Sequence, residues 1–424
     1  MRATGPRWAA LLLALGACAD EAGAPTLHWY VNPDNGGQAR LAARCSAAAG
    51  ARYSIETLPL PADASQQREQ LVRRLAARDG SIDLMSVDVP FVPELATAGF
   101  LRPFTQAEAA PFTHGVLRGA LESATWRGKL VAAPFTASSQ LLWYRRSVAA
   151  RARLPIAARP VTWDELLAAA ERTGTTVEVQ ANRYEGYMVW ISALVASAGG
   201  SILADPEAGK AARPAIDGAA GRRAAAVIRA LARSPAADPA LSTADEEATR
   251  AAFQGRRGGF MVNWPYVYGA AQAAVGAGAL DHAVLEDIGW ARYPRVLPDA
   301  PSRPPLGGID LAVGAFTRHP ALAVEAARCL TSLESQTVYM LDARNPAARA
   351  AVYEDREVRR VFPMADLIRQ SIDEAAPRPR TPYYTDVSTS VVRTFHPPRA
   401  VDPERTPAAA ARLIVDVLDD RVLL

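Results

Sequence analysis

The sequence predicts an α/β fold built around a mainly parallel sheet, and two observations support this. Between residues 26 and 89, short apolar runs alternate with longer amphipathic runs, and alternating strands and helices are typical of parallel α/β sheets. The chain has 424 residues, of which 50% are hydrophobic. This is enough for two or three domains, each with a core of its own.

The first part of the chain is predicted as strand, helix, strand, helix and strand. Residues 26–31 have the apolar character of a buried strand, and the Asn-Pro-Asp-Asn-Gly-Gly run after them predicts a turn. A helix is predicted over residues 38–49 and a strand over residues 53–59. Residues 65–78 place their apolar side chains on one helical face, and residues 82–89 form the next predicted strand.

Later elements are marked by their capping and terminating residues. Thr162 and Glu165 have the Ser/Thr-x-x-Glu spacing of a capping box, which predicts a helix start with a structural role. An apolar helix over residues 187–198 ends at a Gly-Gly pair. The remaining predicted elements are helices over residues 219–233 and 243–253 and a strand over residues 260–263.

The N-terminus has the layout of a secretory signal over residues 1–17. Arg2 and Arg7 precede a short apolar stretch, which is followed by Leu-Gly-Ala and Cys18. This order resembles a bacterial lipobox, in which the cysteine is lipidated, and it predicts a tether over residues 18–26. The expected location is the outer face of the cell membrane, with the lipid on Cys18 as anchor. The alternative is an ordinary cleaved signal with an incidental cysteine.

Cys45 and Cys329 are the two other cysteines of the chain. In an oxidising compartment they are candidates for a disulfide, which would close most of the chain into one loop. The chain-entropy model gives about 5 kcal/mol for such a loop. The alternative is a pair of buried free thiols, a role that cysteine fills well.

Charge and motif content argue against several classes of function. Lys and Arg total 47 and Asp and Glu total 44, and two of the arginines lie in the leader, so no strongly basic surface for nucleic acid is expected. The sequence has no Cys-x-x-Cys pair, His-Glu-x-x-His run, phosphate-binding loop, dinucleotide fingerprint or Gly-x-Ser-x-Gly elbow. We therefore expect no metal, no cofactor and no catalytic residue, although paired carboxylates of a glycosidase remain open.

Candidate binding residues follow from the predicted sheet and from one aromatic segment. Ligands of parallel sheets lie at the carboxyl ends of strands, which points to the turn that holds Asn32, Asp34 and Asn35 and also to Asp88. The second group is Asn263, Trp264 and Tyr266, where a predicted strand breaks. Aromatic rings stack on the apolar face of a sugar, and planar polar groups bind its hydroxyls. The alternative is that these rings fill a core.

Several segments carry motifs that occur in the same order in one known family, between about residues 27 and 400. They are APFT and QLLWYR at 133–145, TWDEL at 162–166, SAGG at 197–200, AFQG at 252–255 with NWPY at 263–266, LGGIDLAV at 306–313, LTS at 330–332 with Glu334 and Gln336, and PRPRTPYY at 377–384. Together they resemble the family 1 extracellular solute-binding proteins, specifically the sugar-binding group. The NWPY, LGG and PRPRTPYY segments are most similar to actinobacterial trehalose-binding lipoproteins of the LpqY type.

This resemblance implies a two-lobe periplasmic-binding-protein-like fold of type II, with a ligand cleft between the lobes and a hinge of crossing strands. It implies a first lobe of residues 27–133 plus 291–332 and a second lobe of residues 134–290 plus 333–424. It also implies a monomeric, non-enzymatic chain that captures a sugar by hinge closure. The implied partners are the sugar, ABC permease subunits and, through them, a cytoplasmic ATPase.

The resemblance also assigns roles by position. Asp88 would accept hydroxyl protons, Trp264 would stack on the ligand, Gly307 and Gly308 would allow close backbone approach, and Arg378 would clamp two hydroxyls. The chain departs from the family pattern at Ser138, where an amide or carboxylate is expected, and at Phe91, where tryptophan is more typical. Serine has a shorter reach than an amide. The resemblance therefore implies a sugar, such as the disaccharides trehalose or maltose, without specifying trehalose.

Another solute remains the alternative. A glycerol phosphate would need converging basic groups, and Arg378, Arg380 and Arg393 are the candidates for them. Peptides and polyamines belong to the same alternative. A secreted glycosidase is the remaining class.

Overall fold

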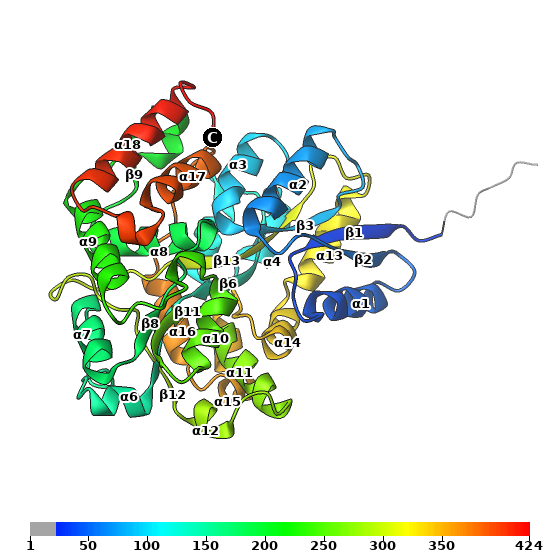
Figure 1. Cartoon of the computed structure of the whole chain (residues 1–424). Coiled ribbons are helices and arrows are strands. Elements are labelled where there is room, and N and C mark those ends of the chain that lie inside the picture. The colour runs from blue at the N-terminus through cyan, green and yellow to red at the C-terminus, as the bar shows by residue number, and fades with distance from the viewer. Residues whose placement is uncertain (1–22) are drawn as a thin grey trace, which may run out of the picture.

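The structure is a computed structural model that describes residues 23–424. The predicted signal at residues 1–17 and the lipidation site Cys18 lie outside the described residues. Within residues 23–424, no helix is both long and apolar enough to cross a membrane. The described chain is organised around two separate main sheets (Figure 1).

The first sheet has five strands. Its order is β2 (Ser54–Pro59), β1 (Thr26–Val31), β3 (Leu84–Asp88), β13 (Leu306–Val313) and β6 (Ala133–Ser139). β1 is parallel to β2 and β3, whereas β13 is antiparallel to both of its neighbours. The sheet is therefore parallel where consecutive strands are joined through helices, and the late strand β13 enters it in the opposite direction.

The second sheet has four strands and is more mixed than the sequence predicts. Its order is β12 (Ile288–Ala291), β7 (Leu141–Arg145), β11 (Gly258–Asn263) and β8 (Thr176–Glu178). β7 is antiparallel to both of its neighbours, and only β8 and β11 run parallel. The mainly parallel arrangement predicted from residues 26–89 does not extend to this half, because β7 enters the sheet directly from the other sheet without a helical crossover.

Helices surround both sheets (Figure 1). Those of the first third of the chain are α1 (Gly37–Ala49), α2 (Ala64–Ala76), α3 (Val92–Thr97), α4 (Gln106–Thr113) and α5 (Arg118–Ser123). Around the second sheet lie α6 (Arg146–Arg151), α7 (Trp163–Thr173), α8 (Glu185–Ser197), α9 (Ala219–Arg233), α10 (Glu246–Gln254), α11 (Tyr266–Gly276) and α12 (His282–Glu286). The later helices are α13 (Pro320–Leu330), α14 (Leu333–Ala343), α15 (Arg356–Val361), α16 (Ala365–Glu374), α17 (Tyr384–Phe395) and α18 (Arg405–Leu418).

Short elements complete the fold. Two small hairpins pair β4 (Thr125–Trp126) with β5 (Lys129–Leu130) and β9 (Leu203–Ala204) with β10 (Arg213–Pro214). The 3-10 turns are η1 (Val89–Phe91), η2 (Pro206–Ala211), η3 (Leu241–Thr243), η4 (Ala350–Glu354) and η5 (Pro398–Ala400).

Three segments connect the two sheets. β6 in the first sheet is followed after Gln140 by β7 in the second, and residues 292–305 lead from β12 back to β13. Residues 375–383 then join α16, which packs on β6, to α17, which packs on α8. The lobe boundaries predicted from the sequence place residues 134–139 and 333–343 in the second lobe. In the structure, β6 belongs to the first sheet, and α14 packs on α1 beside that sheet.

The core of the first sheet is closed by aromatic side chains and by a covalent link. Trp29 and Phe135 pack edge to face, and Phe135 also contacts Tyr339 of α14. A disulfide joins Cys45 of α1 to Cys329 of α13, two helices that contact each other beside this sheet. The link therefore ties early and late parts of the chain together within one half of the molecule.

Candidate ligand-binding site

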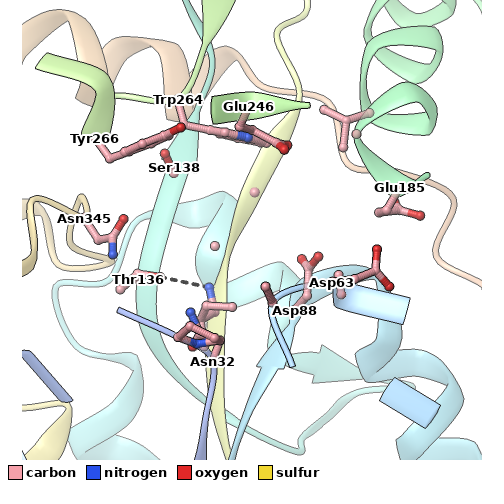
Figure 2. A pocket seen from close by; sticks show the side chains of 18 of the residues that line it. Asn32, Asp63, Asp88, Thr136, Ser138, Glu185, Glu246, Trp264, Tyr266 and Asn345 are labelled. Atoms are coloured by element: carbon pink, nitrogen blue, oxygen red, sulfur yellow. Dashed lines mark hydrogen bonds between the residues drawn. The ribbon is translucent and has the colours of Figure 1, made fainter. Parts of the chain in front are cut away.

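A cavity of about 700 Å³ lies between the two sheets. Residues from both sheets, from several helix starts and from the connecting segments line it (Figure 2). The polar and aromatic lining residues are Asn32, Asp63, Asp88, Thr136, Ser138, Asn182, Tyr184, Glu185, Asp245, Glu246, Glu247, Trp264, Tyr266, Tyr339, Asn345 and Arg378. A volume of this size suits a small ligand that is largely enclosed.

The first sheet contributes the ends of its strands. Asn32 directly follows β1, and Asp88 is the last residue of β3. Both line the cavity, in agreement with the position expected for ligands at the carboxyl edge of parallel strands. Asp63 joins them as the N-cap of α2, where its carboxylate accepts a hydrogen bond from the backbone N–H of Gln66.

The aromatic wall is formed by Trp264 and Tyr266, which follow β11. In Figure 2 their rings face Asn32, Asp63 and Asp88 across the cavity. Both side chains are half-buried, as they must be to offer a ring face to a ligand.

Gly307 of β13 gives Trp264 its position. A Cβ atom at residue 307 would lie 2.6 Å from the Trp264 ring, so the ring rests directly on a backbone that has no side chain there. Gly308 has φ of +139°, and a Cβ there would lie 2.4 Å from the Thr136 carbonyl oxygen. Glycine is therefore required at both positions: at residue 307 it leaves room for the Trp264 ring, and at residue 308 it leaves room for the Thr136 backbone.

Arg378 joins the two halves of the site. Its Nη2 donates to Asp88 at 2.9 Å, and its Nη1 donates to Glu185 at 2.7 Å. Asp88 ends β3 of the first sheet, whereas Glu185 begins α8 beside the second. The two carboxylates hold the pKa of Arg378 well above its usual value despite burial, so the guanidinium is a charged link between the two halves.

Glu185 is fixed from several directions. Besides Arg378, its carboxylate accepts hydrogen bonds from the Tyr384 hydroxyl and, at 2.8 Å, from the Ser388 hydroxyl. Burial raises the pKa of Glu185, and the nearby Arg378 opposes that shift. A buried carboxylate with this set of donors has a fixed orientation.

A second acidic group comes from the start of α10. Glu246 accepts a hydrogen bond from the Tyr184 hydroxyl at 2.6 Å, and burial raises its pKa. Glu247 accepts from the Tyr266 hydroxyl at 2.5 Å and forms an ion pair with Arg250. Burial acts to raise the pKa of Glu247, but hydrogen bonds from Arg250 and Tyr266 outweigh it and the pKa is lowered.

The cavity lining also includes smaller polar groups. The Oγ of Ser138 is buried and has no hydrogen-bond partner among the described residues, although Ser138 lines the cavity. The Thr136 hydroxyl accepts a hydrogen bond from the Ile309 backbone N–H at 2.9 Å, drawn dashed in Figure 2. The Asn345 amide points into the cavity (Figure 2).

Three residues singled out in the sequence lie elsewhere. Asp34 and Asn35 line a neighbouring cavity, and the Asp34 carboxylate accepts from the backbone N–H groups of Gly36 and Gln38. Asn263 is fully buried, and its amide donates to the Glu246 carbonyl oxygen and the Thr249 hydroxyl, so it supports the wall from behind.

Phe91 also lies outside the lining. It packs edge to face on Tyr384, the residue that donates to Glu185. The phenylalanine that replaces the more typical tryptophan at this position therefore packs behind the site and does not line the cavity.

Several residues that line the cavity were not identified from the sequence. Those at or just before helix starts are Asp63, Asn182, Tyr184, Glu185, Asp245, Glu246 and Glu247, and the others are Thr136, Tyr339 and Asn345. The acidic run at residues 245–247 lies within the helix predicted over residues 243–253. Its position at the N-terminal end of that helix was the signal that could have indicated a binding site. Asn345 has no comparable signal because it lies in a loop.

The site consists of hydrogen-bonding side chains and aromatic rings. Within residues 23–424, no group of three or more His, Cys, Asp or Glu side chains is placed to hold a metal ion. The arrangement of planar amides, carboxylates, a guanidinium and ring faces suits a ligand with many hydroxyl groups.

Comparison with known proteins agrees with this architecture. The family model for bacterial extracellular solute-binding proteins matches residues 53–337, which is more than half of the chain. The chain belongs to the bacterial extracellular solute-binding proteins. The proteins of this family are substrate-binding proteins.

One curated relative and several solved structures are similar over most of their length. A probable ABC transporter-binding protein of Deinococcus radiodurans is 27% identical over 341 residues, 77% of each chain. The maltose-bound MalE3 of T. maritima has a TM-score of 0.79 at 23% identity and covers 94% of this chain and 100% of its own. A tagatose-bound solute-binding protein of Thermotoga lettingae has a TM-score of 0.79 at 21% identity, with 93% and 100% covered. These likenesses show a two-lobe periplasmic-binding-protein-like fold.

Proposed function

We propose that the chain captures a neutral sugar in the cavity between its two lobes. The observation that supports this most strongly is the pairing of the Trp264 and Tyr266 rings with facing polar side chains, Asn32 and Asp88 among them, in one cavity (Figure 2). A sugar offers an apolar C–H face to the rings and hydroxyls to the amides and carboxylates. A disaccharide such as trehalose or maltose is the ligand we expect.

The charge of the lining favours a neutral ligand over a phosphate. Six carboxylates line the cavity, from Asp63, Asp88, Glu185, Asp245, Glu246 and Glu247, against the single guanidinium of Arg378. That guanidinium is already shared between Asp88 and Glu185. Arg380 and Arg393 do not line the cavity, so the converging basic groups that a phosphate needs are not present among the described lining residues.

We further propose delivery to a membrane transporter. The name of the Deinococcus relative supports a role with an ABC transporter. The lipobox-like run before Cys18 supports anchoring at the outer face of the cell membrane. Sugar binding would then favour a closed arrangement of the two lobes that the permease recognises.

A thermal-shift panel tests the ligand class. The exported chain without its leader is heated alone and with trehalose, maltose, other mono- and disaccharides, or glycerol 3-phosphate. A ligand at a hundred times its dissociation constant adds about 2.7 kcal/mol to the free energy of unfolding. We expect stabilisation by at least one neutral sugar. Stabilisation by glycerol 3-phosphate alone, or turnover of a chromogenic glycoside, would contradict the proposal.

A further inference from the structure

A second cavity of about 800 Å³ adjoins the first. The residues that line both cavities, and so lie at their common boundary, are Asn32, Pro33, Glu247, Tyr266 and Asn345. In Figure 2 Tyr266 and Asn345 lie together on one side of the first cavity, away from Asp63 and Glu185. The second cavity therefore extends the cleft past the Tyr266 ring.

The second cavity has polar groups that the fold does not use. Gln272 and Arg344 line it, and neither side chain has a hydrogen-bond or ion-pair partner among residues 23–424, although Arg360 and, to a lesser extent, the charge of Arg344 lower the pKa of Glu357. The Asn345 amide has only one long contact, 3.5 Å to the Tyr339 hydroxyl. Amides and guanidinium groups are planar and can bind two neighbouring hydroxyls at once.

The acidic residues of the second cavity are, in contrast, already engaged. Asp342 pairs with Arg40, Glu247 pairs with Arg250, and Asp34 accepts from two backbone N–H groups. Arg40 and Arg250 neutralise Asp342 and Glu247, and the remaining carboxylate, Asp34, balances the charge of Arg344, so the lining carries no net charge. A neutral polyhydroxyl unit is the chemistry that fits.

Arg344 occupies a position where its side chain has a conformational cost. It is the C-cap of α14 with φ of +62°, in the left-handed region where glycine is usual. Its Cγ would lie 2.5 Å from a Cβ at residue 269, so Gly269 leaves room for the arginine stem beside α11. Residues in sparsely populated backbone regions are often found at functional sites.

We propose that the second cavity is a further sugar subsite, so that the cleft also takes an oligosaccharide longer than the disaccharide expected in the first cavity. One part of the ligand lies against Trp264 in the first cavity, and the chain continues past Tyr266 to hydroxyl contacts with Gln272, Arg344 and Asn345. This inference rests on the proposed sugar-binding function. It adds the length of the ligand and the residues that read that length.

Calorimetric titration with sugars of increasing length tests the inference. The exported chain is titrated with trehalose, maltose, maltotriose and maltotetraose, and the titrations are repeated with Arg344→Gly and Gln272→Ala. We expect a longer sugar to bind more tightly than either disaccharide. Each variant should weaken the longer sugar about tenfold, because a hydrogen bond from a charged or amide group is lost, and leave the disaccharides within about twofold.

Arg344→Gly is the sharper variant, because glycine suits the left-handed C-cap and the fold is expected to remain intact. Arg153→Gly is its matched control, since Arg153 is exposed, has φ of +52° and lies outside both cavities. If disaccharides bind and no longer sugar gains affinity, or if the variants weaken all sugars equally, the subsite is refuted and the sugar-binding function stands. If no sugar of any length binds to the folded chain, both proposals fail.

Discussion

Trp264 is the residue on which the proposed recognition depends most. Its ring is held on the bare backbone of Gly307 and faces the cavity beside Glu246 (Figure 2). Trp264→Ala should reduce sugar affinity by at least about 1–2 kcal/mol, or about tenfold, because the stacking face is lost. Trp290→Ala is the control: this half-buried ring packs on Tyr268 outside the cavity. Equal affinities of Trp264→Ala and the wild type, measured by calorimetry, would remove Trp264 from the site.

Glu178 offers a test at the residue scale that is independent of the ligand. Burial raises the pKa of this β8 carboxyl from 4.5 to about 7. Between these values the unfolded chain ionises while the folded chain stays protonated, so the free energy of unfolding falls as pH rises and the loss is complete above the folded pKa. Glu178→Gln should remove this loss and gain up to about 3 kcal/mol over the wild type by pH 8.

Chemical unfolding at pH 4.5 and pH 8 measures the effect of Glu178→Gln. The exposed Glu122→Gln is the control variant for the loss of a carboxylate at the surface. A difference between Glu178→Gln and the wild type that does not grow with pH would show that Glu178 is not protonated in the fold.

Elements whose signals are local in the sequence were predictable in the early and middle parts of the chain. The predicted strand over residues 26–31 and helix over residues 219–233 coincide with β1 and α9. The capping box of Thr162 and Glu165 is present at the start of α7. The direction of β7 and the entry of β13 between β3 and β6 were not predictable, because no local pattern encodes which distant strands will pair.

β13 carries a prediction at the scale of the element. Gly307→Ala places a methyl group 2.6 Å from the Trp264 ring, which must then move. We expect sugar affinity to fall about tenfold, since overpacking by one methyl costs about 1–3 kcal/mol. In a Trp264→Ala background the same change should have little further effect on affinity, because the ring it displaces is gone. Gly276→Ala is the control, as a Cβ there meets nothing within 4 Å. Additive losses in the double variant would contradict this role of Gly307.

At the scale of the molecule, the site is assembled from segments that are distant in the sequence. Asn32 and Trp264 were identifiable because strand ends and aromatic turns have recognisable patterns, whereas the glycines of β13 were identified through the family resemblance. Glu185 and Asn345 were not, because their place in the cavity depends on how the two lobes face each other. The family resemblance implies hydroxyl binding by Arg378, and in the structure its guanidinium is shared between Asp88 and Glu185.

The disulfide concerns the stability of the molecule more than its binding. Cys45 and Cys329 lie 284 residues apart in the sequence, on helices of one lobe, and neither lines the cavity. Replacing both by serine should lower the free energy of unfolding by about 2–5 kcal/mol, because the unfolded chain regains the freedom of a long loop. Denaturant unfolding measures the loss. A fall in sugar affinity at conditions where the variant is folded would show that the link also positions the site.

Calorimetric titration of the leaderless wild-type chain with neutral sugars tests the central claim most directly. We expect one sugar molecule to bind per chain, with an affinity that is insensitive to salt because the ligand is uncharged. The absence of heat with every sugar, from protein shown to be folded, would contradict the account, as would tight binding only to an anionic ligand whose affinity falls with salt.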